Sequence, residues 1–284
     1  MTATINELTA PRRGPVAALR HSIPRDEFFA GLYILGCANG LMGRVLLSLN
    51  SGTGILGVDI SVIVLFACFA GISIMLQEDW DEIRSADLAV GGFFLILVIL
   101  PIFALSWVAI TGLSLYILFF AKGGSARRRG ALILFALTVP MLWSGLLFRF
   151  FTVPILEIDA SLAAWLLGTD RVGTTFRFAD GPGYLAVLPY CSSFANMSLA
   201  FLCFVSITQW AKHQWSSMDI LWSLLACISV IAVNVTRIAL IGLSRWHHDL
   251  IHNEWGNMVV NFTILGLAVG FSVLGARREL FSHA

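Results

Sequence analysis

The chain has 284 residues, of which 58% are hydrophobic and only 12% are charged, whereas soluble globular proteins carry about 25% charged residues. Its mean hydropathy is +0.84 and its formal net charge is +1. This composition argues against a water-soluble domain, and the nearly balanced charge does not indicate a nucleic-acid partner. It favours an all-α, polytopic transmembrane bundle whose surroundings are membrane lipids.

The chain begins with a polar and basic segment over residues 1–27. This segment has no short apolar run with a small-residue cleavage site, so we expect no removable signal peptide. We expect residues 28–275 to form a single transmembrane domain and residues 276–284 to form a cytoplasmic tail.

Apolar runs of about 20 residues are long enough to cross the roughly 30 Å hydrocarbon layer as helices. The chain contains eight such runs, so we expect a bundle of about eight spans. The third and fourth come from one apolar stretch, and we place a tight hairpin between them at residues 104–106. The predicted spans cover residues 28–49, 55–76, 88–105, 107–121, 131–151, 193–210, 220–243 and 258–274.

The distribution of basic residues predicts the orientation, because lysine and arginine gather in cytoplasmic loops. If both termini are cytoplasmic, twelve of the eighteen basic residues fall inside and only three fall outside. We therefore expect a multi-pass protein of the cytoplasmic (inner) membrane with both termini inside. The outside residues are Arg171, Arg177 and Arg245, and three more, Arg44, Arg149 and Arg237, lie within or at the ends of spans.

The longest segment between predicted spans covers residues 152–190 and falls on the outer side. Its first part, ILEIDASLAAWLLG, has helical apolar spacing that predicts a helix along the membrane interface. Its second part, TDRVGTTFRFADGPGYLAVLP, predicts short strands joined by glycine-rich turns. The segment ends one residue before Cys191, so this extracytoplasmic loop leads directly into the sixth span.

The five cysteines form no C-x-x-C pair, which argues against a disulfide framework or a thiolate zinc site. Cys37, Cys68, Cys203 and Cys227 lie inside apolar runs and are expected to be packing residues. Cys191 stands where the outer loop enters a span, and small polar residues follow it. By position alone, a packing role and a chemical role for Cys191 are equally open.

Arg237 lies inside the seventh span, about seven residues from its outer end, which is roughly 10 Å deep at 1.5 Å per residue. An arginine at that depth is costly unless it faces the bundle interior and finds a partner. We expect it to point inward, in a polar stripe with Asn234 and Thr236, and to bond Asn234 or a backbone carbonyl. Arg44 and Arg149 have less polar surroundings, and for them snorkelling to the headgroups is the simpler interpretation.

His252 lies in the outer loop that joins the last two spans. His248 and His252 with Glu254 would form a zinc site only if this segment is helical. The spacing is not H-E-x-x-H and supplies no third ligand, so we expect no metal and no cofactor.

The predicted topology brings Cys191, Arg237 and His252 to the same side of the membrane. A nearby cation or base activates a cysteine by lowering the pKa of its thiol, and a tetrahedral intermediate needs a positive or hydrogen-bonding partner. These three residue types supply those functions, so we expect a catalytic site with a lowered Cys191 pKa. Asn234 would position Arg237, although an interhelical hydrogen bond that serves only packing would explain it equally well.

The ordered fragments CSSFANMSLAF, NVTRIALIGL and HNEWG, on the last three of eight spans, resemble the exosortase/archaeosortase family of membrane sorting enzymes. The resemblance covers about residues 180–260. It implies a cysteine protease or transpeptidase that cleaves the PEP-CTERM-like signal of exported proteins, made of a short motif, a transmembrane helix and a basic tail. It further implies an acyl-thioester intermediate and transfer of the new carboxyl end to an acceptor nucleophile.

The same resemblance implies the roles of individual residues. Cys191 would be the nucleophile, His252 the proton-transfer group, and Arg237 the group that stabilises the thiolate or the oxyanion. The family commonly has C-S-G or C-A-G at the nucleophile, whereas this chain has Cys191, Ser192 and Ser193.

Two functions from other classes fit the sequence as well. In a transporter or channel, Arg44, Arg149 and Arg237 would line an anion pathway, although no internal symmetry of the kind frequent in transporters is visible. A scaffold for envelope assembly would need no chemistry at all. Loss of function in a stable Cys191→Ala protein would favour the enzyme over both.

Overall fold

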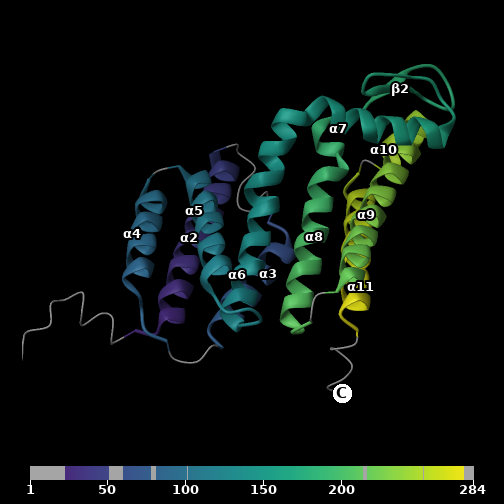
Figure 1. Cartoon of the computed structure of the whole chain (residues 1–284). Helices are drawn as coiled ribbons and strands as arrows, with labels where there is room; N and C mark the ends of the chain where they lie inside the picture. The colour runs from purple at the N-terminus through teal and green to yellow at the C-terminus, as the bar shows by residue number, and fades with distance from the viewer. Residues whose placement is uncertain are drawn as a thin grey trace, which may run out of the picture.

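The computed structural model describes residues 23–50, 60–77, 81–100, 102–213, 216–251 and 253–277. Within these residues the fold is a helical bundle with one small sheet at one end (Figure 1). Six helical runs are long and apolar enough to cross a membrane, which is the make-up of a polytopic membrane protein. The helices are α2 (Arg25–Asn50), α3 (Val62–Met75), α4 (Ser85–Ile99), α5 (Phe103–Phe120), α6 (Ala126–Thr138), η2 (Val139–Trp143), α7 (Ser144–Leu167), η3 (Pro189–Cys191), α8 (Ser193–Trp210), α9 (Ser217–Leu243), α10 (Arg245–Ile251) and α11 (Glu254–Gly275).

The all-helical class is confirmed, and apolar helices lie in each of the eight predicted regions. Two of them are short, however, because α3 has 14 residues and α4 has 15. At 1.5 Å per residue they reach about 21–23 Å, less than the roughly 30 Å of the hydrocarbon layer. Six helical runs, rather than eight, therefore reach spanning length in the described part of the chain.

The turn between α4 and α5 lies earlier than the predicted hairpin at residues 104–106. Ile99 ends α4, Leu100 is extended with a ψ of 137°, and Phe103 already begins α5. Proline disfavours the helical conformation in the residue that precedes it. The helix therefore breaks just before Pro101, and residues 104–106 are helical.

A continuous helical run from α6 through η2 to α7 bends sharply inside α7. Phe151 has non-helical backbone angles (φ −119°, ψ 26°) and lies three residues before Pro154. A proline inside a helix removes one hydrogen bond and clashes with the carbonyl four residues earlier, which explains the bend. Beyond it, the second part of α7 lies across the end of the bundle (Figure 1). This second part is the helix that the sequence predicts after residue 152.

The predicted strands form a three-stranded antiparallel sheet in the order β1-β2-β3. The sheet docks on α9, where the buried Phe176 packs against Gly242; a Cβ atom on this glycine would lie 2.5 Å from the Phe176 ring. The backbone N–H groups of Ala179 and Asp180 donate to the carbonyls of Gly242 and Leu243. We call the second part of α7 together with the sheet the cap. The strands are β1 (Arg171–Val172), β2 (Thr175–Arg177) and β3 (Tyr184–Ala186), with Val172 opposite Thr175 and Phe176 opposite Leu185.

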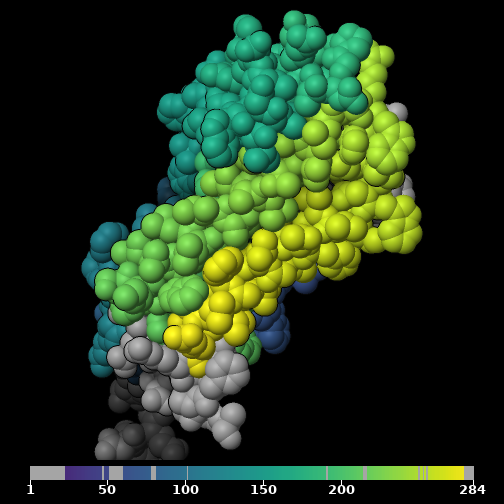
Figure 2. All heavy atoms as spheres, turned by 90° about the vertical axis from the view of Figure 1, so that its right-hand side faces the viewer, coloured from purple at the N-terminus to yellow at the C-terminus, as the bar shows by residue number. Residues whose placement is uncertain are grey.

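The buried side chains form two separate clusters. The larger core joins α2 to α6 with α8 and parts of α9 and α11, and the smaller core lies between α7, the sheet and α9. Figure 2 shows α9 and α11 running side by side beneath the cap, and the two helices pack directly on each other. Cys191 packs against the smaller core.

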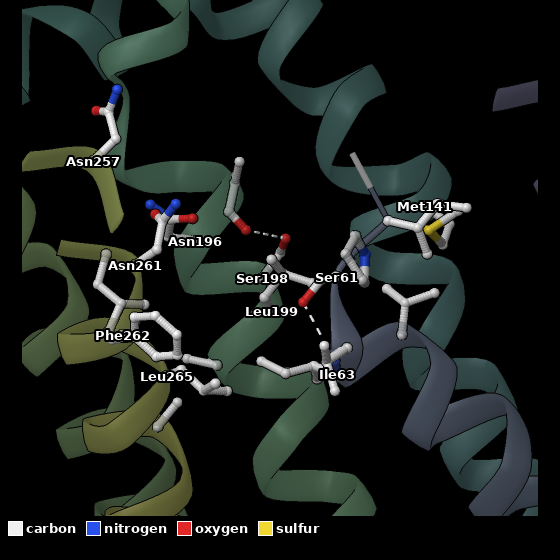
Figure 3. A pocket seen from close by; sticks show the side chains of 18 of the residues that line it. Ser61, Ile63, Met141, Asn196, Ser198, Leu199, Asn257, Asn261, Phe262 and Leu265 are labelled. Carbon is white, nitrogen blue, oxygen red and sulfur yellow. Dashed lines mark hydrogen bonds between the residues drawn. The ribbon is translucent and has the colours of Figure 1, made fainter. Parts of the chain in front are cut away.

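A cavity of about 830 Å³ lies between α3, α8 and α11. Figure 3 shows α8 in the middle, with α3 and α11 on either side. The side chains of Asn257, Asn196 and Asn261 occupy one end of the cavity, and those of Phe262 and Leu265 follow toward the other (Figure 3). The cavity is therefore amphipathic, with a polar end near the start of α8 and of α11.

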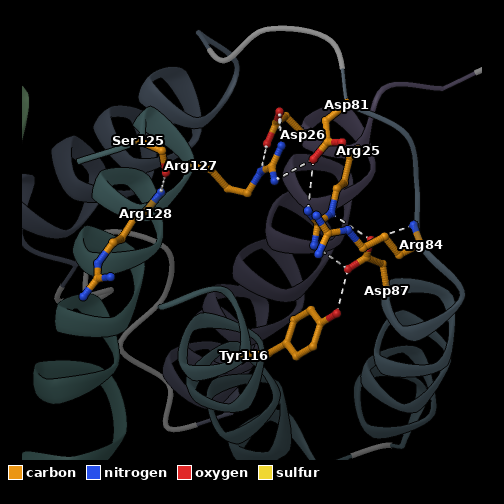
Figure 4. Close-up of polar contacts among 9 residues, drawn as sticks. All are labelled: Arg25, Asp26, Asp81, Arg84, Asp87, Tyr116, Ser125, Arg127 and Arg128. Carbon is orange, nitrogen blue, oxygen red and sulfur yellow. Dashed lines mark hydrogen bonds and ion pairs between the residues drawn. The ribbon is translucent and has the colours of Figure 1, made fainter. Parts of the chain in front are cut away.

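The end of the bundle away from the sheet contains a buried ion-pair cluster (Figures 1 and 4). Arg25 of α2 bonds Asp87 at 2.8 Å and Asp81 at 3.0 Å. Arg127 of α6 bonds both oxygens of Asp26 and reaches Asp81 at 3.1 Å. Arg25 and Arg127 both contribute to the predicted charge asymmetry, yet both are buried and paired rather than open to solvent.

Candidate functional site

Cys191 ends a single turn of 3₁₀ helix immediately before α8. Its N–H donates to the carbonyl of Leu188 at 2.8 Å, which closes the turn. Ser192 caps α8, because its hydroxyl accepts the N–H of Phe194 at 3.2 Å and satisfies a donor that the helix leaves open. The cysteine is half-buried and lies where the loop enters a candidate span.

Ser193 stands where the resembled family commonly has glycine. Among the described non-glycine residues, only Lys212 has a positive φ, so the backbone of Ser193 needs no glycine. The N–H and the hydroxyl of Ser193 donate to the two oxygens of Asp159, at 3.0 Å and 2.7 Å. Ser193 therefore belongs to the hydrogen-bond network around Cys191.

Asp159 is a site residue that the sequence interpretation missed. It lies on the second part of α7 and is only 3% exposed. Burying a carboxylate costs free energy unless it is hydrogen-bonded, and here it receives two donors at the positive N-terminal end of α8. The apolar spacing of the sequence could have indicated that Asp159 is buried, since it shares the buried face of its helix with Leu156, Ala160 and Ala163.

Asn234 of α9 holds the backbone of the cysteine turn. Its amide donates to the carbonyl of Cys191 at 2.7 Å and to the hydroxyl of Ser193 at 3.0 Å. Asn234 therefore does not bond Arg237. Its hydrogen bonds join α9 to the start of α8, which agrees with the alternative interpretation of an interhelical hydrogen bond. Asn234 is 1% exposed, so these bonds lie out of water.

Arg237 lies one turn further along α9 and reaches toward α11. Its Nη2 donates to Oδ1 of Asn257, and neither Asn234 nor a backbone carbonyl is its partner. Its Nε is buried and has no hydrogen-bond partner among the described residues. The predicted polar stripe is also incomplete, since Thr236 is exposed.

The surroundings of Cys191 have opposing effects on the pKa of its thiol. Burial raises the pKa of the thiol, the backbone at Leu188 and the positive charge of Arg237 lower it, and the negative charge of Asp159 raises it again. The net pKa lies above the ordinary value, which is opposite to the lowered pKa that we expected. The reason is that the sulfur packs against the smaller core, where a thiolate would lose its water.

His252 lies outside the described residues, so its predicted catalytic role stays a prediction. Its neighbours on both sides are described. Gly256 packs on the backbone of Ile251, and a Cβ atom there would lie 2.2 Å from the Ile251 carbonyl oxygen. Asn253 caps α11 by accepting the N–H of Gly256 at 2.8 Å. The glycine of the HNEWG fragment is therefore required by the close turn between α10 and α11.

The start of α11 is tied to the cysteine site through Arg237. Asn257, which accepts the Arg237 hydrogen bond, lies in the first turn of α11, and its N–H bonds the carbonyl of Asn253. Asn257 also lines the cavity between α3, α8 and α11. Among the described residues, no three His, Cys, Asp or Glu side chains gather as a possible metal site.

The arrangement provides a half-buried thiol at a helix start, a fixed backbone around it and one cationic group acting on it. Comparison with protein-family models, with curated proteins and with solved structures finds no match to this chain. A role can therefore be assigned to the site only from its geometry and from the resemblance of its sequence motifs.

The charges around Cys191 predict how its alkylation responds to pH. Alkylation requires the thiolate, so its rate should rise with pH and reach half-maximum above the ordinary cysteine pKa of about 8.5. Arg237→Gln removes a charge that lowers the pKa, so the midpoint should move up; Asp159→Asn should move it down. The measurement is the rate of labelling by a membrane-impermeant maleimide from pH 6 to about pH 10.

Thr236→Ala is the matched control, because Thr236 is the exposed neighbour of Arg237 on α9. It should leave the midpoint unchanged. Faster labelling of Arg237→Gln at neutral pH would contradict the assigned action of Arg237 on the thiol.

Proposed function

We propose that this chain is a membrane-embedded cysteine peptidase or transpeptidase of the exosortase/archaeosortase kind. Its substrates are exported proteins with a C-terminal tripartite sorting signal, whose transmembrane helix is the part that the enzyme meets in the membrane. The proposal is carried by one observation: the Asn234 amide donates to the Cys191 carbonyl at 2.7 Å and fixes this half-buried cysteine at the start of α8.

In the first half of the reaction, the Cys191 sulfur attacks the carbonyl carbon of the scissile peptide bond. Because the pKa of the thiol is raised, its proton must leave during the attack, and the resemblance assigns that proton to His252. Arg237 stabilises the oxyanion of the tetrahedral intermediate. When the C–N bond breaks, the proton goes to the leaving amine and an acyl-thioester remains on Cys191.

In the second half, an acceptor nucleophile attacks the thioester carbonyl. The proton of the acceptor returns to the base, the C–S bond breaks, and the thiolate takes the proton back. The buried Asp159 and Asn234 do not exchange protons in this scheme. They hold the start of α8, so that Cys191 keeps its position while bonds form and break.

The proposed topology counts the six long helical runs and the shorter apolar helices α3 and α4 as eight spans, with both termini in the cytoplasm and the site at the extracytoplasmic face of the inner membrane. The aromatic residues near the cap support an interfacial position for that end of the bundle. Trp165, Tyr184, Trp246 and Trp255 are 66–80% exposed, and exposed tryptophan and tyrosine gather at membrane interfaces.

The anion-pathway alternative finds less support. Arg44 lines the cavity, whereas Arg149 is exposed and Arg237, bonded to Asn257, is not among the lining residues. The cavity between α3, α8 and α11 thus contains Arg44 but neither Arg149 nor Arg237 in its described lining. A scaffold without chemistry would not need a fixed cysteine turn.

The proposal is tested by trapping the intermediate. Membranes that contain the protein and a reporter protein with a tripartite tail from the same host should yield an adduct on Cys191 that hydroxylamine releases. The host genome should encode several proteins that end in a shared short motif, an apolar helix and an arginine-rich tail. No adduct with any such reporter, or no such tails in the genome, would overturn the proposal.

A further inference from the structure

The cavity between α3, α8 and α11 contains hydrogen-bonding groups that the protein does not use. Arg44, Asn196 and Asn261 line it, and none of the three side chains has a hydrogen bond or an ion pair among the described residues. In a membrane-spanning bundle, unsatisfied polar groups cost free energy unless water or a ligand meets them. The polar end of the cavity is therefore suited to a ligand that accepts several hydrogen bonds.

The charge of the cavity selects the sign of that ligand. Among the lining residues that the structure describes, Arg44 is the single charged one, and none is an aspartate or a glutamate. The side-chain amides of Asn196 and Asn261 add N–H donors to the lining of the cavity. A guanidinium with two amides fits an anionic group with several oxygens, such as a phosphate.

The other end of the cavity is apolar. Its lining includes Leu199, Phe262 and Leu265, whose side chains lie below those of the asparagines in Figure 3. The walls are apolar at the surface as well, since Val62 of α3 is 70% exposed and Phe262 of α11 is 65% exposed. An apolar chain could therefore enter sideways from the bilayer, between α3 and α11. The cavity volume of about 830 Å³ lies within the usual range for ligand sites.

We infer that this cavity is a binding site for one anionic phospholipid. The phosphate is bound by polar groups of the lining, which Arg44 of α2, Asn196 of α8 and Asn261 of α11 supply, and one acyl chain lies along Leu199 and Leu265. Asn257, the partner of Arg237, also lines the cavity, so the lipid site adjoins the cysteine site and has this one residue in common with it. The inference does not depend on the proposed peptidase function.

The test is native mass spectrometry of the full chain in detergent, titrated with dioleoyl phosphatidylglycerol. The wild-type protein should retain one lipid more tightly than the rest, and phosphatidylcholine should bind more weakly. Arg44→Gln should weaken retention about fivefold, as expected for one arginine at a lipid headgroup. Leu265→Trp fills the apolar end and should remove the tight lipid.

The control is Arg149→Gln, which removes an exposed arginine outside the cavity and should leave retention unchanged. If Leu265→Trp fails to fold, Leu199→Trp fills the same space from α8. Equal retention by all variants would mean that the lipid is only annular, and displacement by inorganic phosphate would mean that a free anion binds; either result overturns the inference. Repeating the titration with Cys191→Ala separates this result from the fate of the peptidase proposal.

Discussion

Replacing Cys191 by alanine is expected to abolish cleavage of a reporter with a tripartite tail, a loss of about 10⁴-fold or more. The loss is large because Cys191 forms the acyl-thioester in the proposed reaction, so both halves of that reaction stop. Alanine removes only the sulfur from a half-buried position, and the hydrogen bond from Asn234 goes to the backbone carbonyl, which remains. The measurement is the cleaved fraction of the reporter in membranes with equal amounts of folded protein.

Cys203→Ala is the matched control, because Cys203 lies on the same helix but is 3% exposed in the larger core. It should leave cleavage intact. Full cleavage by Cys191→Ala would remove Cys191 from the mechanism and return the transporter and the scaffold to consideration. A loss in both variants would point to damage to α8 rather than to lost chemistry.

Replacing Arg127 by methionine is expected to lower the free energy of unfolding by about 3–5 kcal/mol, as expected when one partner of a buried ion pair is removed. The Arg127 guanidinium bonds both oxygens of Asp26, which is 3% exposed (Figure 4). Methionine would fill much of the volume but leave that carboxylate buried without its cation. The measurement is unfolding of the purified full chain in mixed detergent, followed by circular dichroism.

Arg128→Met provides the control, since Arg128 is the exposed neighbour on the same helix. It should change the free energy of unfolding by less than about 0.5 kcal/mol. The double variant Asp26→Leu with Arg127→Met should recover much of the loss, because an apolar pair no longer buries an unpaired charge. Equal destabilisation by Arg127→Met and Arg128→Met would contradict a structural role of the cluster.

The helical architecture could be predicted from the sequence because it depends on local patterns. Runs of apolar residues fix where helices form, and the mixture of helical spacing and glycine-rich turns after residue 152 predicted the cap. The hairpin before α5 was misplaced because the apolar pattern is continuous there, and only the effect of Pro101 on its preceding residue sets the break.

The connections within the site could be predicted only in part. Chain order and topology pointed to Cys191 and Arg237, but they do not say which side chain an amide faces. Asn234 bonds the cysteine turn and Arg237 bonds Asn257 because of the rotation of α9 between α8 and α11. The raised pKa of the Cys191 thiol likewise follows from packing against the smaller core, which no local pattern encodes.

The hydrogen bond between Arg237 and Asn257 joins residues 20 positions apart, on α9 and on the last helix described. A membrane protein is synthesised and inserted from its N-terminus, so Cys191 enters the bilayer before Asn234, and Asn257 comes last of these residues. While the ribosome is still making α11, the cysteine turn exists but the guanidinium has not met its partner. The hydrogen bond between Arg237 and Asn257 therefore forms only after α11 has been made and has packed on α9.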